Sequence, residues 1–268
     1  DNRGLAAVTE AASAAADGVT SLIVLDPEIL DRASPPRVAF YLDCLRALRA
    51  DYRDRGADLL VERGDPAAVL PAVAERQEAT AVHWNRDVSG YAHRRDEAVT
   101  EALAAIDVEA VGHDDLLLHE PGSVLTNAGG TYQVFSPFFE KWRDREKDPP
   151  LKAPATRSLA AVDGGSIPTL ADLGIDDPDQ TLPEAGSAAA RNRLEAFCAD
   201  RIYRYATDRE IPGVDGTSRI SPHLRFGTVG IRTVWHATTA ALADAPDEEA
   251  EDAVREFRRQ IAFREFYA

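Results

Sequence analysis

Residues 57–84 read ADLLVERGDPAAVLPAVAERQEATAVHW, in which two short apolar runs are separated by a helical pattern. The first run, residues 57–61, predicts a buried strand. Residues 64–66, Gly-Asp-Pro, then supply a cap residue and a proline at the first turn of a helix. The second run, residues 80–84, predicts another strand. Two strands joined by a helix imply a parallel pair with a crossover connection, so this stretch favours an α/β fold.

The same alternation continues on both sides of this stretch. Apolar runs at 19–25 and 108–111 predict two more strands, and periodic segments at 35–52 and 92–106 predict helices. Residues 1–16 are alanine-rich and helix-permissive. Because a sheet of this type normally starts with a strand, we expect an initial strand to be missing. The chain also lacks methionine, even at its first position, and we interpret it as a piece of a longer protein.

Beyond the α/β pattern, proline and glycine interrupt the chain and no long periodic segment survives until residue 188. We predict one short helix in this region, at 137–145, and a helical pattern after it, with helices at 188–206, 222–226, 229–242 and 246–268. The sequence therefore predicts an α/β domain at 1–112 with a parallel sheet and crossover helices, an interdomain linker at 113–187, and the first part of an all-α domain at 188–268.

The net charge of −16 is unevenly distributed along the 268 residues. Residues 1–190 have a net charge of −15, whereas residues 191–268 carry twelve arginines against thirteen acids. Six of those acids lie between Asp244 and Asp252, and the remainder of the helical part has a net charge of +5. Only three lysines occur, and an acidic, lysine-poor surface is typical of a halophilic source such as a haloarchaeon. The acidity therefore does not exclude a DNA partner for the helical part.

Several classes of site have no support in the sequence. No apolar run approaches the ~20 residues that span a bilayer, and no signal peptide is visible. Cys44 and Cys198 have no metal or redox spacing, which predicts buried, reduced thiols in a cytoplasmic protein. The six histidines show no paired ligand spacing, so we predict no metal site. The glycine loops that bind phosphate in dinucleotide-binding and P-loop proteins are also absent.

Two stretches of the helical part carry candidate chemistry. Residues 205–227, YATDREIPGVDGTSRISPHLRFG, place hydroxyl side chains and an arginine beside Ser221-Pro222, which resembles a helix N-cap followed by proline. Such a site suits an anion, for example a pyrophosphate, although the residues alone favour an ordinary capped helix after an Asp-Gly turn. Residues 257–268, FRRQIAFREFYA, interleave aromatic residues and arginines, and helical geometry puts Phe257, Gln260, Arg264 and Tyr267 on one face. That pattern fits either base stacking or a core-facing stripe.

These two stretches, in this order, resemble the photolyase/cryptochrome family, in particular its microbial DNA photolyases. GTSRISPHLRFG at 216–227 is similar to the flavin-phosphate loop of the family, and QIAFREFY at 260–267 is similar to its WREFY helix. The resemblance extends over nearly the whole chain, through DNRGL at 1–5, ERGDPAAVLP at 62–71, VHWNRDVSGYAHRRD at 82–96 and TYQVFSPFFEKW at 131–142. It implies a Rossmann-like antenna domain at 1–112, a linker, and a truncated FAD-binding domain at 188–268.

The resemblance also implies roles for individual residues. FAD would be bound by residues from both stretches: Tyr205, Thr217, Ser218, Arg219, Ile220, Ser221, Phe257 and Arg264. A second set of residues would contact DNA and the damaged bases, and it shares Arg264 with the FAD set. Its members are Arg209, Gln260, Phe263, Arg264 and Tyr267. Gln260 stands where many pyrimidine-dimer enzymes have glutamate, and Phe263 where tryptophan is usual. The catalytic determinants themselves would lie in the C-terminal part of the family's sequence, which this chain lacks.

The resemblance implies light-dependent repair of cyclobutane pyrimidine dimers by electron transfer from excited, reduced FAD. It also implies a second, antenna chromophore. Folate-binding relatives have an Asn-Glu pair where this chain has Tyr91 and Ala92, which favours a deazaflavin. We expect UV-damaged DNA as partner and a monomeric, cytoplasmic protein. Three alternatives stay open: a cryptochrome-type photoreceptor, a 6-4 photolyase, and a flavin-free nucleotide-binding module.

Overall fold

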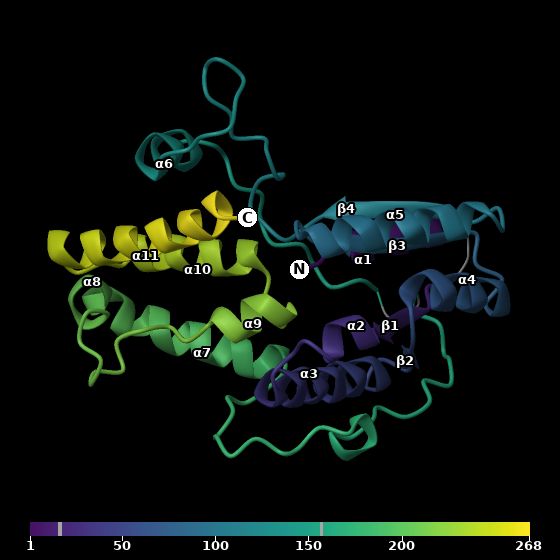
Figure 1. The fold of residues 1–268 in the computed structure, drawn as a ribbon. Coiled ribbons are helices and arrows are strands. Elements are labelled where there is room, and N and C mark those ends of the chain that lie inside the picture. The colour runs from purple at the N-terminus through teal and green to yellow at the C-terminus, as the bar shows by residue number, and fades with distance from the viewer. Residues whose placement is uncertain (16–17, 156–157) are drawn as a thin grey trace. The chain divides into compact units, whose positions relative to one another are not determined.

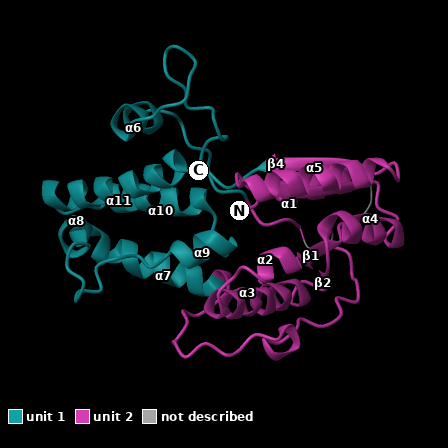
Figure 2. Cartoon of the chain, viewed as in Figure 1, with its two compact units in different colours: residues 1, 114–151, 188–268 teal, residues 2–113, 152–187 magenta. Residues whose placement is uncertain are grey.

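The computed structural model describes residues 1–15, 18–155 and 158–268, and the chain divides into two compact units (Figure 2). Unit 1 contains residue 1, residues 114–151 and residues 188–268, and unit 2 contains residues 2–113 and 152–187. The segment predicted as a linker is therefore divided between the units, its first half packing with the helices and its second half with the strands. The three-part domain division of the sequence stays a prediction.

Unit 2 has the α/β composition that the sequence predicts. Strands β1 (Ser21–Leu25) and β2 (Leu59–Arg63) pair in parallel, with Ser21 opposite Leu59 and Leu25 opposite Arg63. Strands β3 (Ala81–Arg86) and β4 (Glu109–Asp114) form a second pair. Among the described residues no ladder joins β1 to β3, so the four strands form two pairs instead of one continuous sheet. The order of the strands and of the longer helices follows the prediction, with the predicted boundaries within three residues, whereas the short helix α2 (Pro27–Leu30) was not predicted.

Five helices of unit 2 connect or cover these strands, as Figure 1 shows. Their starts follow local capping rules, because Asp26, Asp65 and Ser89 accept hydrogen bonds from backbone amides of the first turns. The helices are α1 (Arg3–Ala15), α2 (Pro27–Leu30), α3 (Pro35–Arg53), α4 (Pro66–Arg76) and α5 (Gly90–Ala104). Residue 16, the last of the first predicted helix, lies outside the described residues.

In the later part of unit 2, residues 164–175 pack on α3 and β2. Arg49 of α3, which is 7% exposed, donates to both carboxylate oxygens of Asp58 at 2.6 and 2.8 Å. Gly164 approaches this pair and the Leu59 carbonyl so closely that a Cβ atom at position 164 would clash. The segment contains one short 3₁₀ helix, η2 (Ala171–Leu173). The ion pair joins α3 to the start of β2, and the segment itself is held there by a hydrogen bond from the Val61 amide to the Gly164 carbonyl and by apolar packing of Ile167, Leu170, Leu173 and Ile175.

Unit 1 is helical, with α6 (Phe135–Arg143), α7 (Ser187–Ala199, of which Ser187 belongs to unit 2), η3 (Arg201–Arg204), α8 (Tyr205–Asp208), α9 (Ser221–Phe226), α10 (Ile231–Ala243) and α11 (Glu248–Phe266). The prediction of one helix over 188–206 was wrong. The helix ends at Ala199 because Asp200 leaves the helical region, with φ −145° and ψ −66°. Its carboxylate instead accepts two hydrogen bonds from Arg204, at 2.9 and 3.0 Å.

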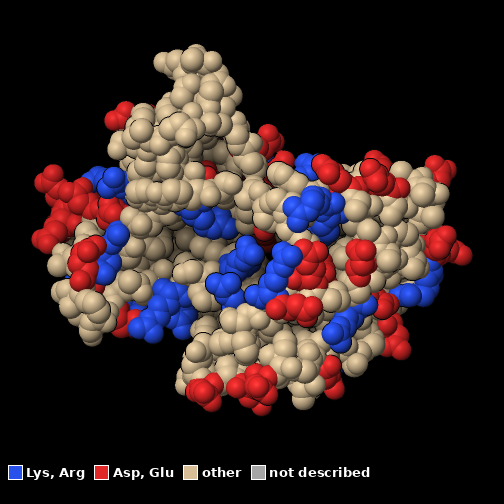
Figure 3. All heavy atoms as spheres, in the orientation of Figure 1, with Lys and Arg blue, Asp and Glu red and all other residues tan. Residues whose placement is uncertain are grey.

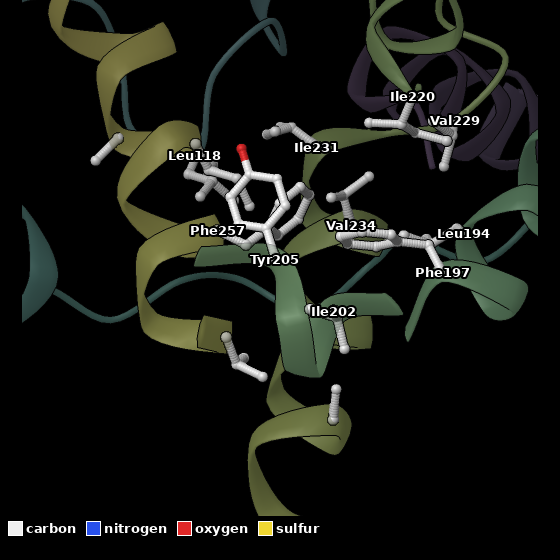
Figure 4. Close-up of a cluster of buried hydrophobic side chains, with 14 of the residues drawn as sticks. Leu118, Leu194, Phe197, Ile202, Tyr205, Ile220, Val229, Ile231, Val234 and Phe257 are labelled. Carbon is white, nitrogen blue, oxygen red and sulfur yellow. The ribbon is translucent and has the colours of Figure 1, made fainter. Parts of the chain in front are cut away.

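One apolar core holds unit 1 together, and Figure 4 shows its centre. Side chains from all of its α-helices contribute, and α11 contributes Val254, Phe257, Ile261 and Ala262. Phe197, Ile202, Val234 and Val254 have no measurable exposure to solvent. Burial of this apolar surface is the main source of stability for the unit. In the described part of the chain, no helix is both long and apolar enough to span a bilayer.

Candidate functional site

The structure brings four of the predicted site residues together at the middle of α11. Tyr205 and Arg209 come from α8 and the turn after it, and Phe257 and Gln260 come from α11. The ring of Tyr205 meets that of Phe257 edge to face, with 5.1 Å between centroids, and the Arg209 guanidinium lies 5.4 Å from the Tyr205 centroid. Tyr205 and Phe257 belong to the same apolar core, which fixes the two helices beside each other.

Phe257 and Tyr205 are core residues as well as site residues (Figure 4). Phe257 is 5% exposed and Tyr205 is 8% exposed. Burial raises the pKa of the Tyr205 phenol, while the nearby Arg209 charge opposes that shift. The phenol therefore stays protonated at neutral pH. Tyr205 can supply a hydrogen-bond donor beside an aromatic surface.

Glu256 joins this group, and sequence reasoning missed it. Its Oε1 atom accepts a hydrogen bond from Arg209 Nη1 at 2.7 Å and another from Gln260 Nε2 at 2.8 Å. Arg209 also pairs with Glu210 at 3.0 Å. The only sequence signal was the spacing of four residues between Glu256 and Gln260, which puts them on adjacent turns of one helix face.

The predicted phosphate loop lies directly before α9. Arg219 adopts φ +49°, a left-handed conformation that is uncommon for a residue with a side chain. Its guanidinium pairs with Asp215 at 3.0 Å, and Arg201 pairs with the same carboxylate at 2.7 Å. Gly216 packs so closely against Asp208 that no side chain fits there. The loop is thus tied to α8 and to the Tyr205 group.

One detail of the loop prediction was wrong. Ser221 is the first residue of α9, and the N-cap position is occupied by Ile220, so no side chain caps this helix. Ile220 is 4% exposed and belongs to the core, which explains why it takes the position. The hydroxyls of Thr217 and Ser221 belong to exposed residues, whereas Ser218 is 7% exposed. Exposed hydroxyls and the Arg219 cation fit a phosphate-bearing group.

The C-terminal part of α11 does not present one common face. Phe257 is buried and Tyr267 is 78% exposed, although the helical pattern put them on the same side. Arg264 donates to the Leu116 carbonyl at 2.6 Å, away from the Glu256 group. Phe263 stacks on Phe135 of α6 with centroids 3.5 Å apart, and Tyr267 lies nearly parallel to Phe263 at 6.1 Å. The aromatic residues therefore form a separate stack.

Glu265 anchors the same helix to the rest of unit 1. This carboxylate is 9% exposed and accepts hydrogen bonds from the indole of Trp142 and from the backbone amides of Leu118 and His119. Burial raises the pKa of Glu265, and the hydrogen bonds and the nearby Lys147 charge oppose that shift. The contacts connect α11, α6 and the loop before α6. Glu265 thus holds the candidate site in place without belonging to it.

Lys147, one of only three lysines in the chain, has its ammonium group bound at the end of α6. Its ammonium donates to the carbonyls of Trp142, Arg143 and Arg145 at 2.5–2.8 Å, at the C-terminal end of α6. It also lies 4.2 Å from the centroid of the Trp142 ring. Burial lowers the pKa of Lys147 to about 8. A compact cation suits this position because it meets several carbonyls at the negative end of a helix dipole.

Charge varies along the helix that carries the site. The start of α11 is acidic, and Figure 3 shows red side chains gathered at that end of the helix. Further along, Arg255, Arg258, Arg259 and Arg264 follow within ten residues. Arg259 lies 5.4 Å from the Phe135 centroid and 5.7 Å from that of Phe263. Arg259, whose side chain is 43% exposed beside the aromatic stack, can therefore attract phosphate, whereas Arg255 pairs with Glu251 and Asp252 of the acidic start.

The structure gives less support for an antenna site. The predicted segment, residues 82–96, forms β3, the loop after it and the start of α5. An open cavity of about 600 Å³ in unit 2 is lined instead by β2, the end of α4 and residues 161–165. None of its lining residues belongs to the predicted segment. Among the described residues no group of three or more potential ligands could hold a metal ion.

Comparison with known proteins places this geometry in a family. A family model described as DNA photolyase matches residues 1–155. The deoxyribodipyrimidine photo-lyase of Halobacterium salinarum is 48% identical over the whole chain and 58% of its own length. The protein of the same name from a Synechococcus strain is 37% identical over the whole chain and 57% of its own length. The chain therefore spans somewhat more than half the length of these curated relatives.

Solved structures agree on the fold. A class III photolyase from Agrobacterium tumefaciens superimposes with a TM-score of 0.84 over 99% of this chain and 55% of its own, at 24% identity. An archaeal photolyase from Sulfolobus tokodaii, solved with two FAD molecules, gives a TM-score of 0.72 over 94% of this chain and 52% of its own, at 21% identity. The predicted fold class is confirmed. Because the family model covers more than half of the sequence, the chain belongs to the DNA photolyase family.

Proposed function

We propose that the protein to which this chain belongs repairs cyclobutane pyrimidine dimers in DNA with light, as a deoxyribodipyrimidine photo-lyase. The observation that carries the proposal is the 48% identity to the enzyme of that name from Halobacterium salinarum, which extends over the whole chain. The same relative supports the halophilic origin that composition predicts. Activity belongs to the full-length protein, because the chain spans only 58% of that relative.

FAD is the proposed cofactor, and bound reduced FAD supplies the electron that opens the dimer when it absorbs light. The contributions of this chain are binding and positioning. Arg219 and the hydroxyls of Thr217, Ser218 and Ser221 would meet the phosphates, together with the backbone at Ile220. Tyr205 and Phe257 provide a buried aromatic wall beside them. Arg264 completes the proposed set, although it contacts the Leu116 carbonyl here.

UV-damaged DNA is the proposed partner. Arg209 would pair with a backbone phosphate, and Gln260 would hydrogen-bond the base edge through its amide. Phe263 and Tyr267 would border the pocket for the dimer, which must leave the duplex for the reaction. A dimer pairs poorly, so extrusion costs less than it does for intact bases. Arg264 would lie next to both FAD and the lesion.

A second, antenna chromophore is proposed for unit 2, with deazaflavin favoured over folate. The support is that Tyr91 and Ala92 stand where folate-binding relatives have an Asn-Glu pair. We further propose a monomer that works in the cytoplasm. A flavin-free nucleotide-binding module is the remaining alternative for unit 2.

The test uses the purified full-length protein. Its absorption spectrum should show flavin bands, and under blue or near-UV light it should convert a thymine-dimer oligonucleotide to the intact sequence. A photoreduced flavin with no repair of this substrate contradicts the proposal and favours a photoreceptor. Repair of a 6-4 photoproduct in its place changes the lesion class. Absence of flavin bands contradicts all the flavin-dependent functions at once.

A further inference from the structure

We infer that Glu256 is a positioning residue of the DNA site, which orients the amide of Gln260 and holds Arg209 until a DNA phosphate replaces the carboxylate. The inference rests on the proposed function and extends it to a residue outside both sequence motifs. Glu256 lies one helical turn before Gln260 on α11. Its side chain is 28% exposed, so the carboxylate lies at the border between the core and solvent.

Three donors surround this one carboxylate. Oε1 accepts from Arg209 Nη1 at 2.7 Å and from Gln260 Nε2 at 2.8 Å. Oε2 lies 3.6 Å from Arg259 Nη1. The neighbouring Phe257 is buried against Tyr205, which fixes the helix backbone beneath the group. Glu256 is the member that connects Arg209 of α8's C-terminal turn to Gln260 of α11.

The hydrogen bond between Glu256 and Gln260 determines which end of the Gln260 amide faces outward. A carboxylate can only accept hydrogen bonds, so it selects the nitrogen end of the amide and would repel its oxygen. One N–H and the carbonyl oxygen of Gln260 are then left for a ligand. The imide edge of a thymine offers the matching N3–H donor and carbonyl acceptor. A fixed amide makes this contact without losing rotational freedom on binding.

Arg209 is restrained by the same carboxylate. It pairs with Glu256 at 2.7 Å and with Glu210 at 3.0 Å, and its side chain is 27% exposed. Two adjacent acids reduce its attraction for phosphates on any DNA that approaches. A phosphate must displace Glu256 before it can pair fully with Arg209. Glu256 therefore lowers affinity for undamaged DNA and favours a ligand that contacts Arg209 and Gln260 together.

The experiment compares three forms of the full-length protein in the dark: wild type, Glu256→Gln and the control Glu251→Gln. The control removes the same charge from the same helix, where Glu251 pairs with Arg255 near the acidic start. Dissociation constants are measured for an undamaged duplex and for the same duplex with one thymine dimer, over a range of salt concentrations. Glu256→Asp serves as the conservative variant, because it keeps the charge near Arg209.

Glu256→Gln should bind undamaged DNA more tightly, and the slope of log K against log salt should steepen by at most about 0.9, the value for one fully free cation, because Glu210 still pairs with Arg209. The preference for dimer DNA should fall about tenfold, because the Gln260 amide is no longer oriented. Glu251→Gln should match the wild type. Glu256→Asp should return the salt slope to the wild-type value, whereas a purely structural role of Glu256 predicts no change in that slope in any variant.

Two results distinguish failure of this inference from failure of the proposed function. If Glu256→Gln keeps both the wild-type salt slope and the wild-type dimer preference, the role of Glu256 is wrong while the function stands. A wild-type protein without dimer preference contradicts the proposed function and the Gln260 half of the inference. The salt slopes then still decide whether Glu256 restrains Arg209.

Discussion

Glu256 and Glu265 lie nine residues apart on α11, and their surroundings differ in almost every respect. Glu256 is 28% exposed and shares its carboxylate among side chains that can move. Glu265 is buried, with 9% of the whole residue exposed, and accepts from the fully buried indole of Trp142 and from two backbone amides, whose positions are fixed by the chain path before α6. The carboxylate with rigid partners serves the fold, and the carboxylate with movable partners is the one that a ligand can displace.

The largest expected effect is that of Glu265→Gln. The substitution removes a buried charge and replaces one acceptor oxygen with an NH2 group, so either the Trp142 indole or the backbone amides of Leu118 and His119 lose their acceptor, and the free energy of unfolding should fall by about 2–4 kcal/mol. Urea unfolding of the full-length protein measures this loss of stability, and Glu251→Gln is the exposed control on the same helix. A loss no greater than that of the control would mean that Glu265 does not anchor α11.

A smaller effect should appear in the pH dependence of stability through Lys147. Its pKa is lowered from 10.5 to about 8 in the folded protein, so the unfolded chain binds more protons between these values. Stability should therefore rise with pH across this window, by about 1–2 kcal/mol after allowance for solvent screening. Unfolding at pH 8 and pH 10 tests this, and Lys147→Met should remove the rise. An equal rise in both proteins would assign it to other groups.

The smallest expected change in stability is that of Glu256→Gln. Its ion pairs are partly exposed, and such pairs contribute at most about 1 kcal/mol. The same urea measurement should therefore separate Glu256→Gln from Glu265→Gln clearly. A destabilisation as large as that of Glu265→Gln would remove the distinction between the two carboxylates and make Glu256 a structural residue.

Local sequence rules predicted most of the elements. Gly64-Asp65-Pro66 correctly marked the start of α4, and apolar periodicity located α3, α5, α10 and α11. These features are local, because a cap residue or a proline acts within one helical turn. The failure at 188–206 lies at Asp200, whose backbone leaves the helical region although its exposed pair with Arg204, four residues later, has the spacing of a continuous helix. Residue type and spacing therefore give no sign of this break.

The sequence predicted the site as two motifs, and the residues that meet in the structure differ from the predicted set. Periodicity put Phe257 and Tyr267 on one face, yet Phe257 is buried by α7 and α8 while nothing covers Tyr267 to the same degree. Phe263 stacks on Phe135, which lies 128 residues earlier in the chain. No rule based on the spacing within one helix includes such partners. Long-range packing therefore decided which motif residues meet.

The sequence by itself determined the α/β pattern, the helical second half, the two motifs and the family they resemble, because these depend on residue type and short spacing. Tertiary structure alone decided that Glu256 joins Arg209 to Gln260, that Glu265 and Lys147 are buried, and that segment 113–187 is divided between two units. The physical reason is that hydrogen bonding and burial of a charged group depend on residues distant in the chain, whose approach is set by packing of the whole core.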